Sequence, residues 1–152
     1  MHTYYLYEVI MNKTEIFELI SKYPSMNLAT IDKSGLPKTR GILMYSADEN
    51  GLIFHTGLFK DLYGELKNNP ATEACFLDTE NYIQIRISGK AVEIDDDTLR
   101  ERIINTPGRE FLKPVIAKFG KEAIRIFRIE NSTASIWSMP SNFTYPKEKI
   151  QL

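Results

Sequence analysis

Residues 54–70, FHTGLFKDLYGELKNNP, decide how the rest of the chain is interpreted. The stretch begins as the end of a strand, turns at Thr56-Gly57 and continues as a short helix. Its apolar residues fall at i, i+3, i+4 and i+7, which is one face of a helix with 3.6 residues per turn. These residues are Phe59, Leu62, Tyr63 and Leu66. Asn68-Asn69-Pro70 ends the helix, because proline cannot continue it and restricts the residue before it.

Lys60 is the unexpected residue in this stretch. The pattern places it in the first turn of the helix, where backbone N–H groups lack partners and the helix dipole is positive. A cation there is unfavourable by roughly 0.3–1 kcal/mol unless an anion is also bound. A phosphate held by Thr56, the free N–H groups and Lys60 would turn that penalty into attraction. The alternative is a solvated surface lysine paired with Asp61.

The composition is that of an ordinary globular protein and predicts a single domain. The chain has 152 residues, of which 43% are hydrophobic and 26% charged, with a formal net charge of −1. A chain of this length buries roughly 68–70% of its unfolded surface. The near-neutral charge gives no electrostatic reason to expect a nucleic-acid or anionic-membrane partner. We therefore expect no nucleic-acid or membrane partner.

The remaining bulk features concern compartment and metals. The one cysteine, Cys75, excludes an internal disulfide and fits a reducing compartment, so we expect a cytoplasmic protein. No apolar run is long enough for a membrane span. The first residues contain an acid and no basic segment, unlike a signal peptide, and we treat residues 1–11 as an N-terminal extension. The two histidines and one cysteine show no metal-ligand spacing.

The pattern of the whole chain predicts a mainly β (α+β) fold. Helices are expected at 12–23, where Asn12 and Glu15 have capping-box spacing, at 95–105, and at 110–119, where Pro114 interrupts or restarts the helix. Expected strands are 26–31, 36–45, 52–56, 72–77, 82–94, 124–129 and 133–139. Hairpin-length connections imply antiparallel pairing, hence an antiparallel six- to seven-stranded split or closed β-barrel with helices outside. The barrel domain spans 12–139, and 140–152 is a polar tail expected on the surface.

Two more polar positions stand on expected strands. Arg40 would share an anion with Lys60 if the barrel brings its strand beside the one that ends at Thr56. Gln84 offers both a donor and an acceptor, which suits a ring edge carrying N–H and C=O groups. The alternative for Gln84, with Arg86 and Ser88, is the solvent-facing side of a half-buried sheet.

Five short motifs, in this order and spacing, resemble the pyridoxamine 5'-phosphate oxidase-like family, a flavin-binding split β-barrel. The resemblance covers roughly residues 12–139. The motifs are Leu28-Ala29-Thr30-Ile31, Gly35-Leu36-Pro37-Lys38-Thr39-Arg40, Thr56-Gly57-x-x-Lys60-Asp61-x-Tyr63, Asn69-Pro70 and Gln84-x-Arg86-x-x-Gly89.

The resemblance implies a homodimer with FMN at the subunit interface. By matching positions, Arg40 and Lys60 would hold the phosphate, helped by Thr56. The backbone of Gly41, Ile42 and Leu43 would line the isoalloxazine ring, and Gln84 would hydrogen-bond its pyrimidine edge. Trp137 lies where the family often has a tryptophan near the flavin, although core or dimer-interface packing is the rival explanation. Replacing Lys60 or Arg40 by alanine is expected to lower FMN affinity with little change in folding.

The chain also departs from the family pattern. The true oxidase ends in an Arg-x-His-Asp-Arg-like segment that handles its substrate, whereas the residues after Trp137 include no arginine or histidine. Thr56 and Lys60 are also closer together than in the oxidase. These departures leave the substrate open. The resemblance implies an FMN-dependent oxidoreductase acting on an unknown small molecule. A non-enzymatic FMN-binding protein, for storage or sensing, is the alternative.

Two further possibilities receive less support. His55 is expected to be a hydrogen-bonded structural histidine, although ligand or proton-donor roles are conceivable because some relatives use a histidine in this region. Phe54, Phe59 and Tyr63 are candidate stacking platforms for nucleic acid, but their spacing favours core packing. Asp61 and Asp78 have no partner residues of the kind hydrolases require.

Overall fold

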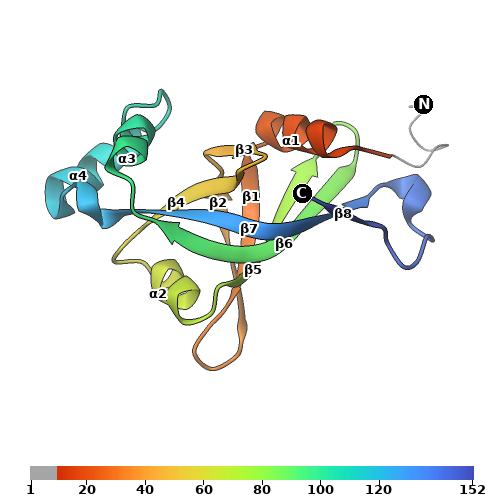
Figure 1. The fold of residues 1–152 in the computed structure, drawn as a ribbon, viewed down its shortest axis with the longest axis horizontal. Coiled ribbons are helices and arrows are strands. Elements are labelled where there is room, and N and C mark those ends of the chain that lie inside the picture. Colours follow the sequence, from red (N-terminus) through yellow and green to blue (C-terminus); the bar gives the residue numbers. More distant parts are fainter. Residues whose placement is uncertain (1–9) are drawn as a thin grey trace.

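The computed structural model describes residues 10–152 (Figure 1). Its helices are α1 (Lys13–Lys22), α2 (Asp61–Asn68), α3 (Asp97–Ile104) and α4 (Lys113–Phe119). Its strands are β1 (Ser25–Ile31), β2 (Pro37–Leu43), β3 (Ser46–Asp48), β4 (Gly51–Gly57), β5 (Ala71–Asp78), β6 (Ile83–Ile94), β7 (Ile124–Trp137) and β8 (Lys149–Gln151).

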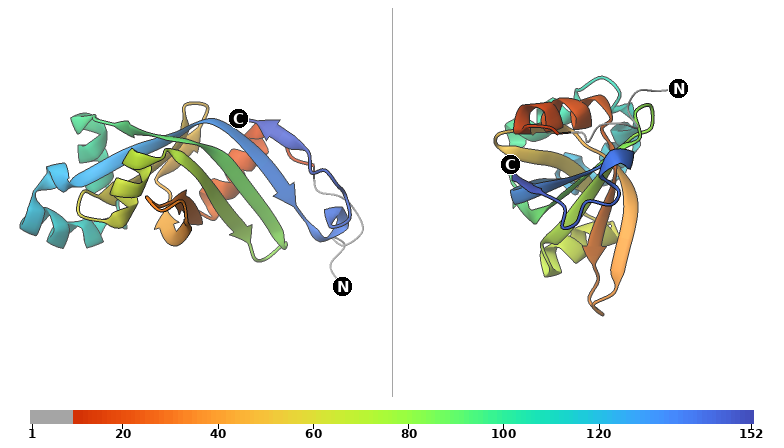
Figure 2. Two further views of the ribbon diagram at one scale, coloured as in Figure 1. Left: turned by 90° about the horizontal axis from the view of Figure 1, so that it is seen from below. Right: turned by 90° about the vertical axis from the view of Figure 1, so that its right-hand side faces the viewer.

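All strands belong to one antiparallel sheet that curls into a half-barrel. Seven strands follow the path β2-β1-β5-β6-β7-β4-β3, and β8 pairs with β7 beside that path. Within residues 10–152 the two ends of the path, β2 and β3, do not pair with each other, so the barrel stays split. Strands β1 and β2 run steeply across the direction of β4 and β7 (Figures 1 and 2). The predicted antiparallel split barrel with peripheral helices is confirmed.

The core follows from the alternation of apolar residues along the strands. On β6, Ile85 and Ile87 are fully buried, whereas Arg86 and Ser88 point to solvent, as their spacing predicts. Phe54 of β4 stacks on Phe127 of β7 with ring centroids 5.7 Å apart. A second, smaller cluster packs α3 and the segment before α4 against the ends of β4 and β7. Its buried residues are Ile53, Leu99, Ile103, Leu112, Ile124 and Ile126.

Helix α1 begins as the sequence predicts. The Asn12 side chain accepts a hydrogen bond from the Glu15 backbone N–H at 2.9 Å, and the Glu15 carboxylate accepts one from the Asn12 N–H at 3.2 Å. This reciprocal pair is a capping box, which satisfies two donors that the helix itself leaves free. Ile16 and Ile20, one turn apart, are then fully buried and fix α1 on the sheet.

The two strands expected at 124–129 and 133–139 are one continuous strand, β7. The predicted turn at 130–132 is a local irregularity, where Asn131 has a positive φ of 50° and the β6–β7 register shifts between Ser88 and Lys90. Gly89 permits this bulge, because a Cβ there would meet a side-chain carbon of Ile129 at 2.6 Å. Local turn residues in the sequence were outweighed by pairing along the whole length of β6.

Three other boundaries differ from the sequence-based expectation. Helix α2 begins at Asp61, so Phe59 lies before it and stacks on Phe119 with centroids 4.7 Å apart. The helix expected at 110–119 is a 3₁₀ turn (Glu110–Leu112) followed by α4, with Pro114 in the first turn of α4, where proline is tolerated. The tail returns to the sheet as β8, where Lys149 pairs with Ser135.

Candidate functional site

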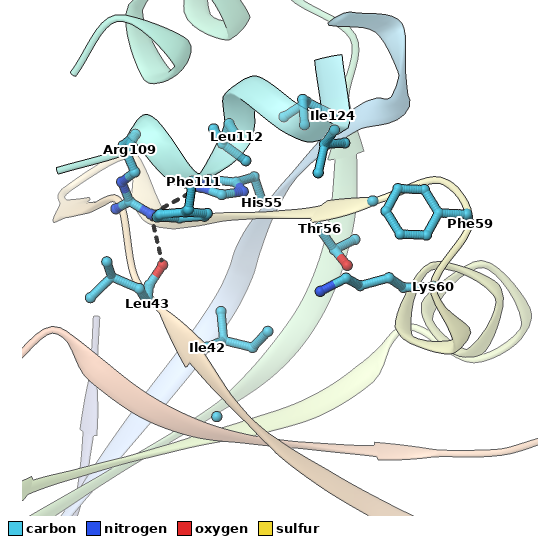
Figure 3. Close-up of a pocket in the computed structure, with 13 residues that line it drawn as sticks. Ile42, Leu43, His55, Thr56, Phe59, Lys60, Arg109, Phe111, Leu112 and Ile124 are labelled. Atoms are coloured by element: carbon cyan, nitrogen blue, oxygen red, sulfur yellow. Dashed lines mark hydrogen bonds between the residues drawn. The ribbon is translucent and has the colours of Figure 1, made fainter. Parts of the chain in front are cut away.

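A pocket lies at the seam of the half-barrel, by which we mean the space between β2 and β4 (Figure 3). Gly41, Ile42 and Leu43 of β2 form one wall, and His55, Thr56 and Gly57 of β4 form the other. Phe59 and Lys60 line it beyond the end of β4, and the segment before and within α4 covers it. The covering residues are Arg109, Phe111, Leu112 and Val115, with Ile124 of β7 beside them.

The size of the pocket suggests a site that one chain encloses only partly. Its cavity volume is about 190 Å³. Pockets that bury a whole organic ligand measure roughly 300–1,000 Å³. A ligand of cofactor size would therefore extend beyond the part of the site that this chain forms.

The lining of the pocket carries positive charge. It contains two cationic side chains, Lys60 and Arg109, and among residues 10–152 no aspartate or glutamate lines it. Lys60 takes part in none of the salt bridges found in the same range, although the chain as a whole has a net charge of −1. A concave site with one sign of charge concentrates the field and attracts the opposite sign. The pocket is thus suited to an anion.

Thr56 supplies an unsatisfied polar atom beside Lys60. Its side chain is buried, and its Oγ1 has no hydrogen-bond partner within the part of the chain that the structure describes. Leaving a buried hydroxyl unpaired costs about 1–3 kcal/mol, so such groups usually have a partner. Figure 3 shows the Thr56 hydroxyl and the Lys60 ammonium extending into the same space. A bound ligand atom there would satisfy the hydroxyl.

The N-terminus of α2 lies at the same point. Lys60 is the N-cap residue, with extended backbone angles (φ −91°, ψ 149°) and no side-chain capping hydrogen bond. The sequence pattern placed Lys60 within the first turn, whereas in the structure it precedes that turn. It is still at the positive end of the helix dipole. The helix begins without a side-chain cap. The Tyr63 N–H donates to the Lys60 carbonyl at 3.1 Å, whereas the N–H groups of Asp61 and Leu62, which have no partner within residues 10–152, are available to a ligand.

Arg109 and His55 form a hydrogen-bonded pair on the other side of the pocket. The Arg109 guanidinium donates to His55 Nε2 at 2.9 Å and to the Met44 carbonyl at 3.0 Å. It also packs over the ring of Tyr45. Burial first, then the charges of Arg109 and Lys60, lower the pKa of His55 from 6.5 to about 4. His55 is therefore neutral near pH 7, and it is hydrogen-bonded as predicted.

The low pKa of His55 predicts a pH-dependent stability. Between its unfolded pKa of 6.5 and its folded pKa of about 4, the unfolded chain binds the proton and the folded chain does not. Stability is therefore complete above pH 6.5 and decreases as the pH falls. We expect the free energy of unfolding to drop by about 2 kcal/mol from about pH 7.5 to about pH 5.

Urea unfolding at the two pH values measures this effect, with His55→Gln as the control. The variant lacks the titrating ring but retains every carboxylate, so the carboxylate contribution cancels in the comparison. An equal pH-induced loss of stability in both proteins would show that His55 does not titrate in this way.

Arg109 and Phe111 were missed by the sequence interpretation. Phe111 is half exposed and stacks on His55 with ring centroids 6.2 Å apart. Both residues follow a Pro-Gly break and lie about fifty positions after Lys60, with no motif around them. Only the packing of the segment between α3 and α4 over the seam brings them to the pocket.

Arg40 does not line the pocket. Its guanidinium forms an ion pair with Glu65 of α2 and donates to the Thr30 hydroxyl at 2.7 Å and the Leu28 carbonyl at 3.2 Å. These contacts tie β2 and β1 to α2. Arg40 and Lys60 were expected to share an anion if the strand of Arg40 lay beside the strand that ends at Thr56. Instead, β2 pairs with β1, and β4 pairs with β7, so strand pairing does not bring the two residues together.

Gln84 and Trp137 are neighbours of each other but lie away from the pocket. They are register partners on β6 and β7, at the end of the sheet near β8. Thr56 pairs with Arg125, and Trp137 lies twelve residues farther along β7. At roughly 3.3 Å per residue, that separation is on the order of 40 Å along the strand. One chain therefore cannot bring all eight predicted cofactor residues around one small molecule.

Two other classes of site, a metal centre and a membrane-spanning helix, are absent from residues 10–152. No cluster of three or more histidine, cysteine or acidic residues there could hold a metal ion. None of the helices in this range is long and apolar enough to cross a membrane.

The fold and pocket define an antiparallel split β-barrel with a positively charged site at its seam. The family model for pyridoxamine 5'-phosphate oxidase matches residues 13–137. The chain belongs to this family. A curated relative, the pyridoxine/pyridoxamine 5'-phosphate oxidase of Haemophilus influenzae, is 34% identical over 82 residues, which are 54% of this chain and 39% of the relative. The match therefore spans less than half the length of that enzyme.

Solved structures share the fold at low sequence identity. A Clostridium acetobutylicum protein related to general stress protein 26, of the pyridoxinephosphate oxidase family, has a TM-score of 0.68 at 16% identity, covering 91% of this chain and 93% of the other. HutZ, the heme storage protein from Vibrio cholerae, has a TM-score of 0.53 at 15% identity, covering 78% of this chain and 89% of the other. The same barrel thus occurs in proteins with different functions.

Proposed function

We propose that the protein binds FMN at the seam of the half-barrel and acts as an FMN-dependent oxidoreductase on a small molecule. The observation that carries the proposal is the pocket itself: among residues 10–152 no carboxylate lines it, and the Thr56 hydroxyl, which has no partner in that range, lies beside Lys60. A ligand carrying a phosphate matches both groups, because a phosphate accepts several hydrogen bonds and is anionic. Family membership supports FMN as that ligand.

Each part of the pocket has a role in this proposal. Lys60, Thr56 and the N-terminus of α2 hold the phosphate. The backbone of Gly41, Ile42 and Leu43 lines the ring system, and Gly41 has open space where a side chain would stand, with no atom within 4 Å of an added Cβ. When bound, the flavin supplies hydride or electron transfer. The chain binds and orients it, and the cover from Arg109 to Val115 limits water access on one side.

The proposal includes a homodimer in which two chains complete each site. Two observations support it: the cavity of one chain is small for a whole cofactor, and Gln84 with Trp137 lies far along the sheet from Thr56. In a dimer the second copy would provide Gln84 for the pyrimidine edge and Trp137 beside the ring. Arg40 stays a predicted phosphate ligand, but only if its guanidinium leaves Glu65.

The substrate is the least defined part of the proposal. Residues 138–152 supply no arginine or histidine that would bind a phosphorylated substrate. The second candidate is a non-enzymatic FMN-binding protein for storage or sensing, which needs no substrate-binding residues. That a heme storage protein shares the fold is consistent with this alternative. The single cysteine is consistent with a cytoplasmic location.

Spectroscopy and turnover test the proposal. The purified protein, reconstituted with FMN, should show a flavin spectrum, migrate as a dimer and release FMN on heating. Oxidation of a reduced nicotinamide nucleotide, with a panel of small acceptors, should then exceed the rate with free FMN. Bound flavin without turnover would favour storage or sensing. Failure to bind FMN at micromolar concentrations would refute both functions.

A further inference from the structure

Arg109 is a buried cation that has no carboxylate partner in the described part of the chain. The residue is 6% exposed and takes part in none of the salt bridges formed within residues 10–152. Burial lowers the pKa of its guanidinium, which keeps its charge because arginine does not lose its proton in proteins. Its close partners are the Met44 carbonyl and His55 Nε2. The Leu43 carbonyl lies farther away, at 3.5 Å from the guanidinium. The contact with a histidine nitrogen, which is a neutral acceptor, calls for an explanation.

The contact determines which nitrogen of His55 carries the proton. A guanidinium has five N–H donors and no acceptor, so Nε2 must accept and cannot carry a hydrogen. Since the ring is neutral near pH 7, with a pKa of about 4, the proton is on Nδ1. Arg109 thus selects one tautomer of a buried imidazole. The second nitrogen becomes an obligatory donor.

The Nδ1–H donor has no partner within residues 10–152. No hydrogen bond joins His55 Nδ1 to any group in the described part of the chain, and His55 lines the pocket. Figure 3 shows the ring turned with Nε2 toward Arg109, on the side of the pocket away from Lys60 and Phe59. The pocket therefore has two separate polar points, one at Thr56 and Lys60, the other at His55.

We propose that His55 donates its Nδ1–H to an acceptor atom on the non-phosphate part of the ligand, with Arg109 as the positioning residue that fixes the tautomer. This inference rests on the proposed FMN function. It makes His55 a determinant of affinity for the ring or ribityl part of the flavin, independent of the phosphate. In this arrangement His55 Nε2 is engaged by Arg109 and is not free to bind heme iron.

Binding of FMN and of riboflavin, which lacks the phosphate, tests the proposal. His55→Met loses the Nδ1–H and introduces no other donor, because a thioether only accepts, and it should weaken both flavins by a similar factor of about 5–10. Thr56→Val should weaken FMN by about tenfold and leave riboflavin unchanged. Fluorescence titration of the full chain measures all four affinities, and thermal unfolding without flavin confirms that each variant is folded.

The outcomes separate the two proposals. Unchanged affinity of both flavins in His55→Met would overturn the role of His55, whatever Thr56→Val does. Equal loss of FMN and riboflavin in Thr56→Val, or no loss of either, would instead remove the phosphate site. A loss confined to FMN in His55→Met would place His55 at the phosphate and would also overturn the inference.

A measurement without flavin tests the tautomer itself. In a His2→Gln background, His55 is the only histidine, and its two ¹⁵N resonances report which nitrogen is protonated. We expect a protonated Nδ1 and an unprotonated Nε2 at pH 7, and a shift toward the Nε2–H form in Arg109→Met. A protonated Nε2 in the unaltered Arg109 protein would contradict the role assigned to Arg109, and an unchanged tautomer in Arg109→Met would contradict it equally.

Discussion

Replacing Lys60 by methionine and Thr56 by valine together should weaken FMN binding by about 100-fold. Both groups are proposed to donate to the anionic phosphate, and a hydrogen bond to a charged group is worth about 1.5–3 kcal/mol, so the two losses correspond to at least about two orders of magnitude in Kd. Valine matches threonine in shape and removes the hydroxyl that has no partner among residues 10–152. Flavin fluorescence titration of the purified variant measures the change.

Lys33→Met is the matched control for this experiment. It removes the same charge from an exposed lysine in the turn between β1 and β2, outside the pocket. Its FMN affinity should equal that of the unaltered protein, which separates a local phosphate contact from a general effect of net charge. If the double variant binds FMN as tightly as the control, the phosphate is held elsewhere.

Replacing Arg40 by methionine should destabilise the folded protein by about 2–3 kcal/mol. The Glu65 side chain is only 11% exposed, and without Arg40 its carboxylate would stay in the interior without its cation. Removing one partner of a buried pair costs about 3–5 kcal/mol, and the 25% exposure of the Arg40 side chain reduces that figure. Urea unfolding of the flavin-free protein measures the difference.

The pair variant Arg40→Met with Glu65→Met shows whether the ion pair is the cause. Two apolar side chains of similar length leave no unpaired charge, so most of the lost stability should return. The structure thus revises the expectation that an Arg40 substitution changes FMN affinity with little change in folding. Equal stability of Arg40→Met and the unaltered protein would mean that the ion pair with Glu65 does not hold α2 in place.

The fold was largely predictable because its signals are local. The alternation around Ile85 and Ile87 identifies the long central strand, and the Asn12–Glu15 pair marks the start of α1. Hairpin-length loops then imply antiparallel neighbours. The continuity of β7 was not predictable, because Asn131 favours a turn locally and the pairing with β6 that overrides it is not visible in the sequence.

The candidate site was predictable only in part. Thr56 and Lys60 follow a strand and precede a helix, which is a local pattern with a physical meaning. Arg109 reaches the pocket from more than forty positions away, and the Arg40–Glu65 pair joins a strand to a helix twenty-five positions later. Contacts of that kind depend on tertiary packing, which composition and periodicity do not encode.

The most direct test of the central claim is a crystal structure of the full chain grown with FMN. The account predicts a phosphate within hydrogen-bond distance of Thr56 Oγ1 and Lys60 Nζ, at the N-terminus of α2, with the ring system along Gly41 to Leu43. A structure in which FMN lies elsewhere, or in which this pocket holds no FMN at saturating concentration, would contradict it.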